Sequence, residues 1–590
     1  MPMSVGALWV GLMLLSLPVP ITLSCITGKA DECKDLEFAP GSNLAGEGFD
    51  ITKMQRKGAY VIDMSSWMLR DKKCVICNNP YLGRKEKLPV SIVDWRPSHQ
   101  CNMKVSSSIY ESSESLVTSS SNSVENDWKV NLEVQDKRGE GKLMLAGTQS
   151  NLAQYSMEKT KKDRFSFTSH QVSCSYYSYR ISNQPRLHSE FQHAVKKLPK
   201  KYNSKSKQRY YKFIDIFGTH YITKVRLGGS VSSVTSIRQC EAALQGLSVE
   251  EVKTCLDVEA AASVGQRLNV NTNYKHCEED KNQMENKASF SSKFNDRLTE
   301  IRGGHTTEPE LLFSAQKHPT AYKEWMTSLA TTPDLVSYSL DSLHELLPNS
   351  EPKAQPLQKA ISHYILEHSL WKNCSEPCPM GVKTHPKDSC ICACHNNPGV
   401  TPSCCPSKRG LARVKVTVQR GSGLWGDYDT GTDGYVKVFS LGVPAGRSPV
   451  IYNNNNPTWN YMLDMGTLVL SMENNLRFEV WDEDSKWDDD QLGACDVKLT
   501  AGVKEDLCTL NHGLLYYKTE VECAPNLGGE SCHDYVESPM NLQLKKSYVS
   551  RNAHPVPKEI LAKMGVLLDT HYNTSMAVGT NDYSNKFAAE

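Results

Sequence analysis

The chain lacks any apolar run long enough to cross a bilayer as a helix, apart from its first residues. It also lacks an excess of either charge, because 67 basic residues stand against 66 acidic ones in 590 residues. A nearly neutral molecule has no global electrostatic field that would draw it to nucleic acid or to an anionic membrane. Any contact with a membrane must therefore come from a local site.

The one long apolar stretch, Val5 to Leu23, is interrupted by Pro18 and Pro20. A short apolar core of this kind at the N-terminus is typical of a secretory signal, and we expect residues 1–24 to be removed by cleavage near Ser24. The alternative is an uncleaved anchor helix, although the two prolines shorten the usable span. The sequence therefore predicts a secreted protein.

Recognisable catalytic motifs are also missing from the chain. There is no G-x-S-x-G segment, and His344-Glu345 begins the pattern H-E-x-x-H but reaches Pro348 where the second histidine belongs. His220 lies within an expected strand with no evident serine or cysteine partner, so we interpret it as structural. We do not expect an enzyme; a secreted calcium-dependent lipid hydrolase is the alternative from that class.

Cysteine, in contrast, is abundant. Twenty cysteines behind a signal peptide predict disulfide bonds. The pair Cys74-Val-Ile-Cys77 alone would suggest a redox or zinc site, but bridging is the better interpretation in a secreted chain. Zinc in the cysteine-rich part is disfavoured because His385 and His395 lack finger spacing. Seven cysteines fall within 32 residues that cannot bury a core and must be cross-linked: Cys374, Cys378, Cys390, Cys392, Cys394, Cys404 and Cys405.

A chain of this length holds roughly two to four domains. In the first part, alternating apolar residues over Trp128–Val134 predict a strand, and Ser248 with Glu251 forms a capping box for a helix. A further helix is expected over Gln358–Trp371. From about Gly410 to Pro525, short alternating strands separated by turns predict an antiparallel sandwich.

A distinctive run extends from Tyr211 to Gly229. The expected strand begins in Gly218-Thr219-His220-Tyr221 and stops at the pair Gly228-Gly229, where the missing side chains allow a bend or the approach of another backbone. This run resembles the signature of the membrane attack complex/perforin (MACPF) family, whose members form pores in bilayers. By the same resemblance, Gly303-Gly304 is a second hinge.

The resemblance implies an α+β multidomain fold. Its first domain would be the bent sheet with flanking helical clusters that MACPF proteins share with cholesterol-dependent cytolysins. A small disulfide-rich EGF-like segment and an antiparallel β-sandwich resembling a C2 domain would follow. The expected boundaries are a signal at 1–24, the MACPF domain at 25–373, the EGF-like segment at 374–409, the C2 domain at 410–525 and a C-terminal tail at 526–590.

Two acidic loops, residues 423–433 and 481–490, would lie at one end of the sandwich. Crowded carboxylates repel one another, and they are hard oxygen ligands that suit the about six to eight coordination positions of Ca²⁺ better than the small octahedral shell of Mg²⁺. The alternative is two solvated loops with no ion. Asp488 is a further candidate and Asp429 has no assigned role. The resemblance to C2 domains implies six ligands: Asp427, Asp433, Asp482, Asp484, Asp489 and Asp490.

Three aromatic residues, Trp425, Tyr428 and Trp487, stand among these acids. Their rings are amphipathic and suit the headgroup region of a membrane once the carboxylate charge is cancelled. We therefore expect calcium to switch the tip from repelled to membrane-binding. The asparagines at 453–456, before Pro457, are expected to form the loop between the two acidic loops. Simple packing of the aromatic residues within the turns is the alternative.

Two stretches are candidates for membrane-inserting strands: Gly147–Tyr179, and the 73 residues at 230–302 between the two glycine pairs. Both also carry charges at helical spacing. In the family such helical clusters unfold into β-hairpins that line a large oligomeric pore, as a transmembrane β-barrel. The alternatives are permanently helical linkers, and a non-lytic adhesion or developmental protein with the same fold.

The expected partners are a phospholipid membrane and further copies of the chain, with no nucleic acid. The resemblance implies immune killing, a place in the cytolytic granule lumen before secretion, action at the target cell membrane, and delivery together with proteases. Asn373-Cys-Ser and Asn573-Thr-Ser are acceptor sites for N-glycosylation, which suits a secreted protein.

Overall fold

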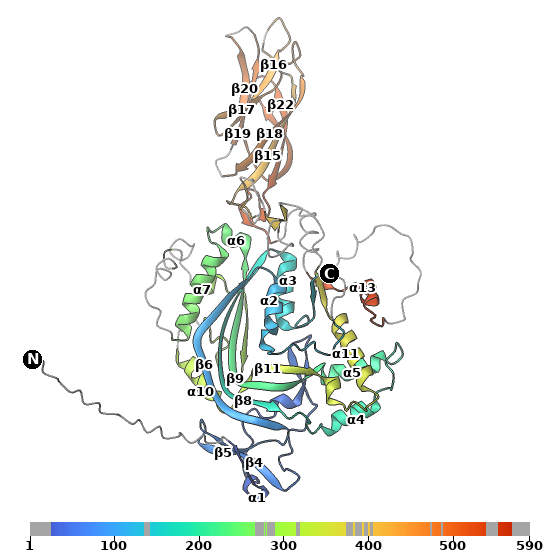
Figure 1. The fold of residues 1–590 in the computed structure, drawn as a ribbon. Helices are drawn as coiled ribbons and strands as arrows, with labels where there is room; N and C mark the ends of the chain where they lie inside the picture. Colours follow the sequence, from blue (N-terminus) through green and yellow to red (C-terminus); the bar gives the residue numbers. More distant parts are fainter. Residues whose placement is uncertain are drawn as a thin grey trace, which may run out of the picture.

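The structure is a computed structural model of the chain. Two assemblies of strands dominate it, a large curved sheet and a separate sandwich at one end (Figure 1). The residues it describes are 25–134, 142–265, 277, 279, 290–313, 319–372, 382–383, 392–393, 399–401, 405–426, 428–471, 475–484, 488–537 and 553–568.

The large sheet has seven strands in the order β3-β2-β9-β8-β6, with β10 and β11 both pairing with β9. Strands β6 and β9 have 19 residues each and β8 has 17, far beyond the usual strand length of roughly 3 to 10 residues. Their strong curvature is plain in Figure 1. The bounds are β2 (Glu47–Asp50), β3 (Gln55–Tyr60), β6 (Ile92–Tyr110), β8 (Phe165–Ile181), β9 (His220–Arg238), β10 (Arg297–Arg302) and β11 (Asp334–Ser342).

The expectation that the signature strand stops at Gly228-Gly229 is wrong. Strand β9 continues to Arg238, and what changes at the glycines is its partner. β11 pairs with β9 up to Gly228, and β10 pairs with it from Ser230 onward. The missing side chains therefore serve a bend and a change of neighbour within one long strand.

Helices occupy two connections of the large sheet, the one from β6 to β8 and the one from β9 to β10. Between β6 and β8 lie α2 (Ser113–Ser120) and α3 (Asn151–Lys162), which we call the first helical cluster. Between β9 and β10 lie α6 (Gln239–Ala243), α7 (Val249–Ser263) and α9 (Phe290–Lys293), the second helical cluster. The candidate stretch Gly147–Tyr179 is therefore only partly helical, because its second half is already strand β8.

The capping box before α7 is confirmed. The Ser248 hydroxyl accepts from the Glu251 N–H at 3.1 Å, and the Glu251 carboxylate accepts from the Ser248 N–H at 2.7 Å. Val252, Cys255 and Leu256 are buried on one side of the helix, as its apolar spacing predicts.

The strand expected over Trp128–Val134 is wrong, because this segment forms turns. The Asp127 side chain accepts from the Lys129 N–H at 3.2 Å, and Asn131 has a φ of 63°. Trp128 and Val134 are nevertheless buried, while Val130 is 56% exposed. An aspartate that accepts from its own backbone two residues on competes with an extended conformation.

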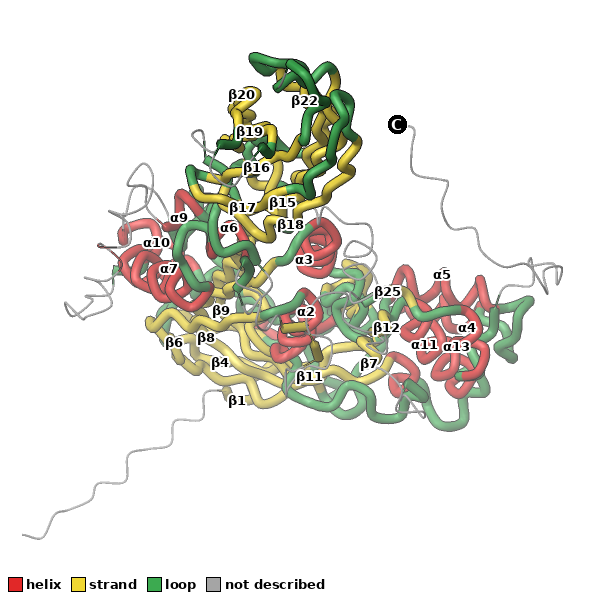
Figure 2. Tube along the Cα trace, turned by 90° about the horizontal axis from the view of Figure 1, so that it is seen from above, coloured by secondary structure: helices red, strands yellow, loops and turns green. Residues whose placement is uncertain are grey.

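A second group of helices lies beside the sheet, on the side away from α7 and α10 (Figure 2). It comprises α4 (Ser189–Lys197), α5 (Lys207–Phe217) and α11 (Ala354–Glu367). The helix expected over Gln358–Trp371 thus begins and ends four residues earlier, because Leu370 and Trp371 belong to strand β12 (Leu370–Lys372). Helix α10 (Pro319–Ser328) completes the opposite side.

Disulfides join strands and connect parts of the chain, and no cysteine among the described residues is free. Cys74 and Cys77 each form a bridge, as expected for a secreted protein. Cys405 ties the cysteine-rich segment to Cys240 near the end of β9. The described bridges are Cys25–Cys77, Cys33–Cys74, Cys101–Cys174, Cys240–Cys405, Cys255–Cys277, Cys495–Cys508 and Cys523–Cys532.

The expected sandwich is present, and all its ladders are antiparallel. Val414, Val416 and Val418 of one sheet and Phe478 of the other are buried in its core. One sheet has the order β18-β15-β22-β21 and the other β17-β16-β19-β20. The bounds are β15 (Leu411–Ser422), β16 (Gly434–Ser440), β17 (Val443–Arg447), β18 (Thr458–Val469), β19 (Asn475–Asp482), β20 (Asp490–Lys498), β21 (Gly502–Thr509) and β22 (Leu514–Cys523).

Smaller elements lie at the edges of the large domain. A three-stranded sheet with α1 (Ala30–Cys33) is formed by β1 (Cys25–Lys29), β4 (Lys73–Asn79) and β5 (Arg84–Lys87). Another joins β7 (Lys142–Met144), β12 and β25 (His554–Pro555), after which α13 (Lys558–Lys563) packs near α11 (Figures 1 and 2). Two-stranded pairs are β13 (Val382–Lys383) with β14 (Cys392–Ala393) and β23 (Leu527–Gly528) with β24 (Asp534–Tyr535). None of the helices in the described part of the chain has the length and hydrophobicity needed to span a bilayer.

Candidate calcium and membrane site

Three aspartates come together because neighbouring strands of one sheet begin and end at the same tip of the sandwich. Asp433 directly precedes β16, Asp482 is the last residue of β19 and Asp490 is the first of β20. The ladders place Gly434 opposite Asp482, and Asp482 opposite Asp490. The antiparallel register thus brings to one tip acidic residues that are about 50 positions apart in sequence.

The closest of these contacts joins the two acidic loops. The Asp433 N–H donates to Asp482 Oδ1 at 2.6 Å, and Asp482 is only 2% exposed. The loop around Gly426 approaches so closely that a Cβ there would lie 1.8 Å from Asp482 Oδ2. The absence of a side chain at Gly426 therefore leaves room beside this carboxylate oxygen.

The asparagines at 453–456 connect the first acidic loop to the rest of the tip. The Asn453 N–H donates to Asp433 Oδ1 at 2.6 Å, and Asn453 Oδ1 accepts from the Gly431 N–H at 2.9 Å. Asn455 Oδ1 accepts from the Thr432 N–H, and Asn456 Oδ1 from the Gly423 N–H, each at 2.9 Å. The sequence indicates this loop but not its use of amide side chains as backbone acceptors.

The remaining acids differ in their partners. Asp489 Oδ2 accepts from the Tyr435 hydroxyl at 2.7 Å, and burial together with this bond raises the pKa of Tyr435. Glu483 forms an ion pair with Arg447 at 2.7 Å and accepts from the Tyr452 hydroxyl at 3.2 Å. Asp429, Asp484, Asp488 and Asp490 are exposed, whereas Asp427 lies outside the described residues.

The aromatic residues expected at this tip are found at its surface. Tyr428 is 92% exposed and Trp425 is 42% exposed, with their rings edge to face at 5.2 Å. The Trp425 ring also lies 5.3 Å from that of His512. Trp487 lies outside the described residues. An almost fully exposed tyrosine beside a half-exposed tryptophan gives the acidic tip an amphipathic edge.

The chemistry of these donors fits a hard divalent cation. Aspartates of two loops lie at one tip, Gly426 leaves space beside the Asp482 carboxylate, and backbone N–H groups fix the orientation of Asp433 and Asp482. Oxygen ligands in a loop-borne, irregular arrangement suit Ca²⁺. Among the described residues, the one trio of ligand atoms that lie within 4.8 Å of one another is His99 with Cys101 and Cys174, whose two sulfurs form a disulfide; the described acids of the tip form no such trio.

The two expected glycine hinges lie against each other in the large sheet. A Cβ at Gly228 would lie 1.8 Å from the Cys174 carbonyl oxygen, and one at Gly229 would lie 2.8 Å from the Arg302 carbonyl oxygen. Gly303 and Gly304 have φ of 72° and 70°, and a Cβ at Gly303 would lie 2.3 Å from the Gly228 carbonyl oxygen. A residue with a side chain would clash with the facing backbone at Gly228 and Gly229, and would also be strained by the positive φ at Gly303 and Gly304.

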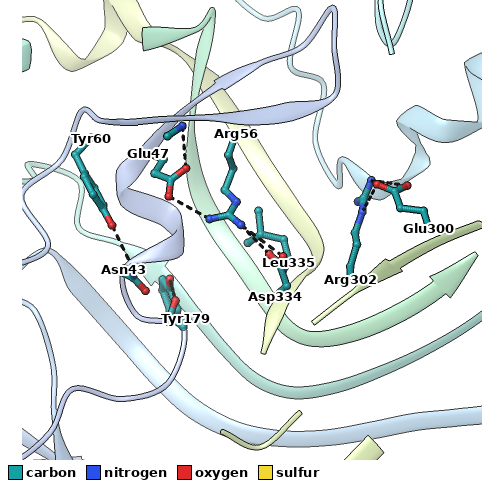
Figure 3. A network of polar contacts seen from close by, with 11 residues as sticks. Asn43, Glu47, Arg56, Tyr60, Tyr179, Glu300, Arg302, Asp334 and Leu335 are labelled. Atoms are coloured by element: carbon teal, nitrogen blue, oxygen red, sulfur yellow. Dashed lines mark hydrogen bonds and ion pairs between the residues drawn. The ribbon is translucent and has the colours of Figure 1, made fainter. Parts of the chain in front are cut away.

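Charged residues brace the same region (Figure 3). Arg56 of β3 reaches Glu47 of β2 and Asp334 of β11, each at 3.2 Å, and Asp334 stands opposite Gly228 in the ladder. The ion pairs therefore join three strands beside the bend. Arg56 is half-buried, so solvent screens these pairs less than it screens fully exposed ones.

The other signature residues have structural surroundings. Gly218 ends α5 with a φ of 86°, and the buried Thr219 hydroxyl accepts from the Ile51 N–H at 3.1 Å. His220 lies between the Thr219 hydroxyl at 2.8 Å and the Trp128 carbonyl at 3.0 Å, and burial lowers its pKa to about 4. Tyr221 is half-buried, next in β9. A neutral histidine held by these two groups packs the sheet against the turn at Trp128.

Asn373 and Asn573, the expected glycosylation acceptors, lie outside the described residues, as does most of the segment from 374 to 404.

Family comparisons agree with this architecture. The family described as "MAC/Perforin domain" matches residues 38–372, which is more than half of the chain. "Perforin-1-like, EGF domain" matches residues 373–407, and "C2 domain" matches residues 412–512. The expected fold class, a MACPF domain followed by EGF-like and C2 domains, is confirmed.

Curated relatives match nearly the whole chain. It is 39% identical to Perforin-1 of Rattus norvegicus over 531 residues, which cover 89% of this chain and 95% of the relative. It is also 39% identical to Perforin-1 of Homo sapiens, over 90% of this chain and 97% of the relative. Among solved structures, it is 11% identical to GNIP1Aa from Chromobacterium piscinae over 90% of this chain and 99% of that chain, with a TM-score of 0.38.

Proposed function

Because this chain belongs to the membrane attack complex/perforin family, we propose that it is a secreted, calcium-dependent pore-forming cytolysin that acts in immune killing of target cells. The observation that carries the calcium part is the contact between Asp433 and Asp482 at an acidic tip flanked by exposed aromatic rings. This acidic tip with its aromatic rings supports docking of the sandwich on a membrane.

In this proposal Asp427, Asp433, Asp482, Asp484, Asp489 and Asp490 hold calcium. Bound Ca²⁺ supplies positive charge that cancels the repulsion of the carboxylates from one another and from an anionic surface. Trp425, Tyr428 and Trp487 then enter the headgroup region, where amphipathic rings are stable. Protonation of the carboxylates at low pH opposes ion binding and therefore docking.

Pore formation requires the large domain to change and to assemble. In our proposal docked copies associate side by side, and the two helical clusters unfold into β-hairpins of a shared transmembrane barrel. Closed barrels satisfy every backbone group within the bilayer, which isolated hairpins do not. The opposed glycine pairs, Gly228-Gly229 and Gly303-Gly304, serve as the point where the sheet bends during this change. The signature residues from Gly218 to Tyr221 anchor the start of β9.

The finer points of the biology follow from the same proposal. The protein resides in the lumen of cytolytic granules before release, carries N-glycans at Asn373 and Asn573, and acts together with co-delivered proteases. It acts on lipid without cleaving it, so it is not an enzyme. Support for these points comes from the secretory signal and the acceptor sequences, together with the family membership.

The test is leakage of dye from phospholipid vesicles and lysis of red cells by the purified protein, with and without calcium. We expect leakage only with calcium, no release of fatty acid, and rings visible by electron microscopy. Asp433→Ala is expected to abolish calcium-dependent vesicle binding. The control is Asp496→Ala at the other end of β20, where the aspartate faces Arg477 at 3.4 Å and takes no part in the tip.

Sealed vesicles at millimolar calcium would contradict the proposal and favour a non-lytic adhesion protein. Fatty-acid release would favour a lipid hydrolase instead. Equal vesicle binding by Asp433→Ala and Asp496→Ala would show that the metal assignment is wrong.

A further inference from the structure

One disulfide lies wholly inside the segment that connects β9 to β10. Cys255 of α7 and Cys277 are both buried, with their Cα atoms 5.5 Å apart. The bridge closes a loop within the segment that connects β9 to β10. If the cluster unfolds into a hairpin, as the proposed function requires, the bridge must be accommodated in the extended form or must first be broken.

The register of the flanking strands decides between these outcomes. β10 pairs with β9 from Arg302 opposite Ser230 to Arg297 opposite Thr235, without a shift, so the residue numbers of each pair sum to 532. The numbers of Cys255 and Cys277 also sum to 532. If both strands continued in the present register, these two cysteines would stand directly opposite each other.

A direct cross-strand position is one that a disulfide can span. Opposed residues in an antiparallel pair have Cα atoms about 4.5 to 5.5 Å apart, within the normal range for a bridge. A shift of two residues moves the partners to roughly 7 to 8 Å, which is too far. The protein already contains two such bridges, because Cys25 opposes Cys77 in β1–β4 and Cys101 opposes Cys174 in β6–β8.

Charges near the bridge follow the same register. It would place Lys253 opposite Glu279, an attractive cross-strand pair. In the present structure Lys253 is instead paired with Asp257 along the helix at 2.6 Å, and Asp257 also contacts His170 of β8 at 2.8 Å. Two more opposite-charge pairs follow from the sequence alone, since their lysines lie outside the described residues: Asp257 with Lys275 and Glu251 with Lys281.

The α7 sequence also has the alternation of a membrane-crossing strand. Residues of a strand point alternately to its two faces, and barrel strands alternate between lipid and lumen. From Glu251 to Val264, one face would carry the apolar residues Val252, Leu256, Val258, Ala260, Ala262 and Val264, with Thr254 among them. The other would carry Glu251, Lys253, Cys255, Asp257, Glu259 and Ser263, with Ala261 among them. The bridge therefore belongs to the polar, lumen-facing side.

We propose that the Cys255–Cys277 disulfide is a register clamp: it survives insertion as a cross-strand bridge on the lumen face of the second hairpin and fixes the alignment of its two strands. It is formed while the segment is helical, yet it matches the extended pairing. Insertion therefore exchanges the helix contacts of Lys253 and Asp257 for cross-strand ones without any thiol chemistry.

The first test is mass analysis, without reduction, of pores made on vesicles by the unmodified protein. We expect the peptides that contain Cys255 and Cys277 to remain joined. Free thiols at these positions in the pores would overturn the proposal. If the unmodified protein makes no pores at all, the proposed function fails, whereas pores with free thiols or a different alignment contradict only the register clamp.

The second test probes alignment directly with added cysteine pairs, keeping the natural bridge. Lys253→Cys with Glu279→Cys lies in register, and Glu251→Cys with Glu279→Cys is its control, displaced by two residues on the same face. After pore formation and oxidation, we expect the first pair to be joined and the second to remain free. The opposite result, or equal joining of both pairs, would overturn the proposed register.

Discussion

Asp163 is a buried carboxylic acid at the joint between the first helical cluster and the segment after the sandwich. It follows α3 and is 2% exposed, and it accepts from the Asn526 amide at 3.1 Å and from the Tyr535 hydroxyl at 2.5 Å. Burial raises its pKa from 3.8 to about 6, although these bonds and the charge of Arg238 act in the opposite direction. The ionised form is therefore costly in the folded protein.

The consequence is a stabilisation of the joint by acid. Because the pKa of Asp163 is higher in the folded protein than in the unfolded chain, protonation stabilises the fold. This stability is complete below about pH 3.8 and is lost as the pH rises through about 6. Asp163→Asn removes this titration. The quantity to compare is the free energy of unfolding of the variant minus that of the unmodified protein. We expect this difference to be lower at pH 5 than at pH 7 by on the order of 1 to 2 kcal/mol.

Denaturant unfolding at several pH values without calcium measures this difference. The control is Asp496→Asn, an exposed aspartate of the sandwich. Parallel pH curves for Asp163→Asn and the unmodified protein would contradict the buried-acid interpretation.

At this scale the sequence predicts residue types better than their partners. The acidic loops predict carboxylates at one tip, because clustering of like charges is visible in the chain. The Asn453 and Asn455 contacts, and the acceptor role of Asp482 toward Asp433, depend on how two loops fold over each other. A linear pattern holds no information on that geometry. The glycine pairs are the exception, since an absent side chain directly signals close approach.

Among the elements, predictions hold where one local interaction dominates. The capping box at Ser248 and the alternating valines of β15 both correspond to observed elements, since capping and face burial are local patterns. Trp128–Val134 fails because two turn-forming side chains outweigh a two-residue period. The expected end of β9 at the glycine pair is wrong because a strand can change neighbours without ending.

The capping box offers a test of whether α7 must unfold. Ser248→Ala removes the bond from the Glu251 N–H to the Ser248 hydroxyl, keeps the backbone bond from the Ser248 N–H to the Glu251 carboxylate, and should destabilise the helical form by about 1 kcal/mol. If this stability is lost from the soluble form, in which α7 is helical, and not from the transition state for insertion, the barrier to insertion falls. Lysis at limiting protein should then become about fivefold faster. Vesicle leakage rates, with calcium-dependent binding measured in parallel, check this expectation.

A serine that precedes a helix outside the helical clusters, and whose hydroxyl bonds the turn before that helix, provides the control. Ser206 precedes α5, where its hydroxyl accepts from the Asn203 N–H at 2.9 Å and donates to the Lys201 carbonyl at 2.8 Å. Ser206→Ala should lower stability without accelerating leakage. Slower leakage in Ser248→Ala would indicate that α7 stays helical during pore formation.

At the scale of the whole molecule, the chain after the sandwich returns to the large domain. Strand β25 adds to β12, and the Ala553 N–H donates to the Glu114 carboxylate of α2 at 2.7 Å. Further along, Lys207 of α5 donates to the Leu567 carbonyl at 2.8 Å. The tail thus connects the first helical cluster to the helices on the other side of the domain. The sequence shows two prolines here and no pattern that predicts these contacts.

Removal of residues 538–590 should therefore weaken the large domain and spare the sandwich. The truncation exposes the core that Val556, Leu561 and Val566 now help to cover, each 5 or 6% exposed. Burial of such a side chain contributes roughly 1.5 to 3 kcal/mol, so several kcal/mol should be lost. Calorimetry should show that the first unfolding transition occurs at a lower temperature. Calcium-dependent vesicle binding should persist, because β15 to β22 are intact. An unchanged first transition would show that the tail rests on the domain without stabilising it, and loss of vesicle binding would show that the two domains do not act independently.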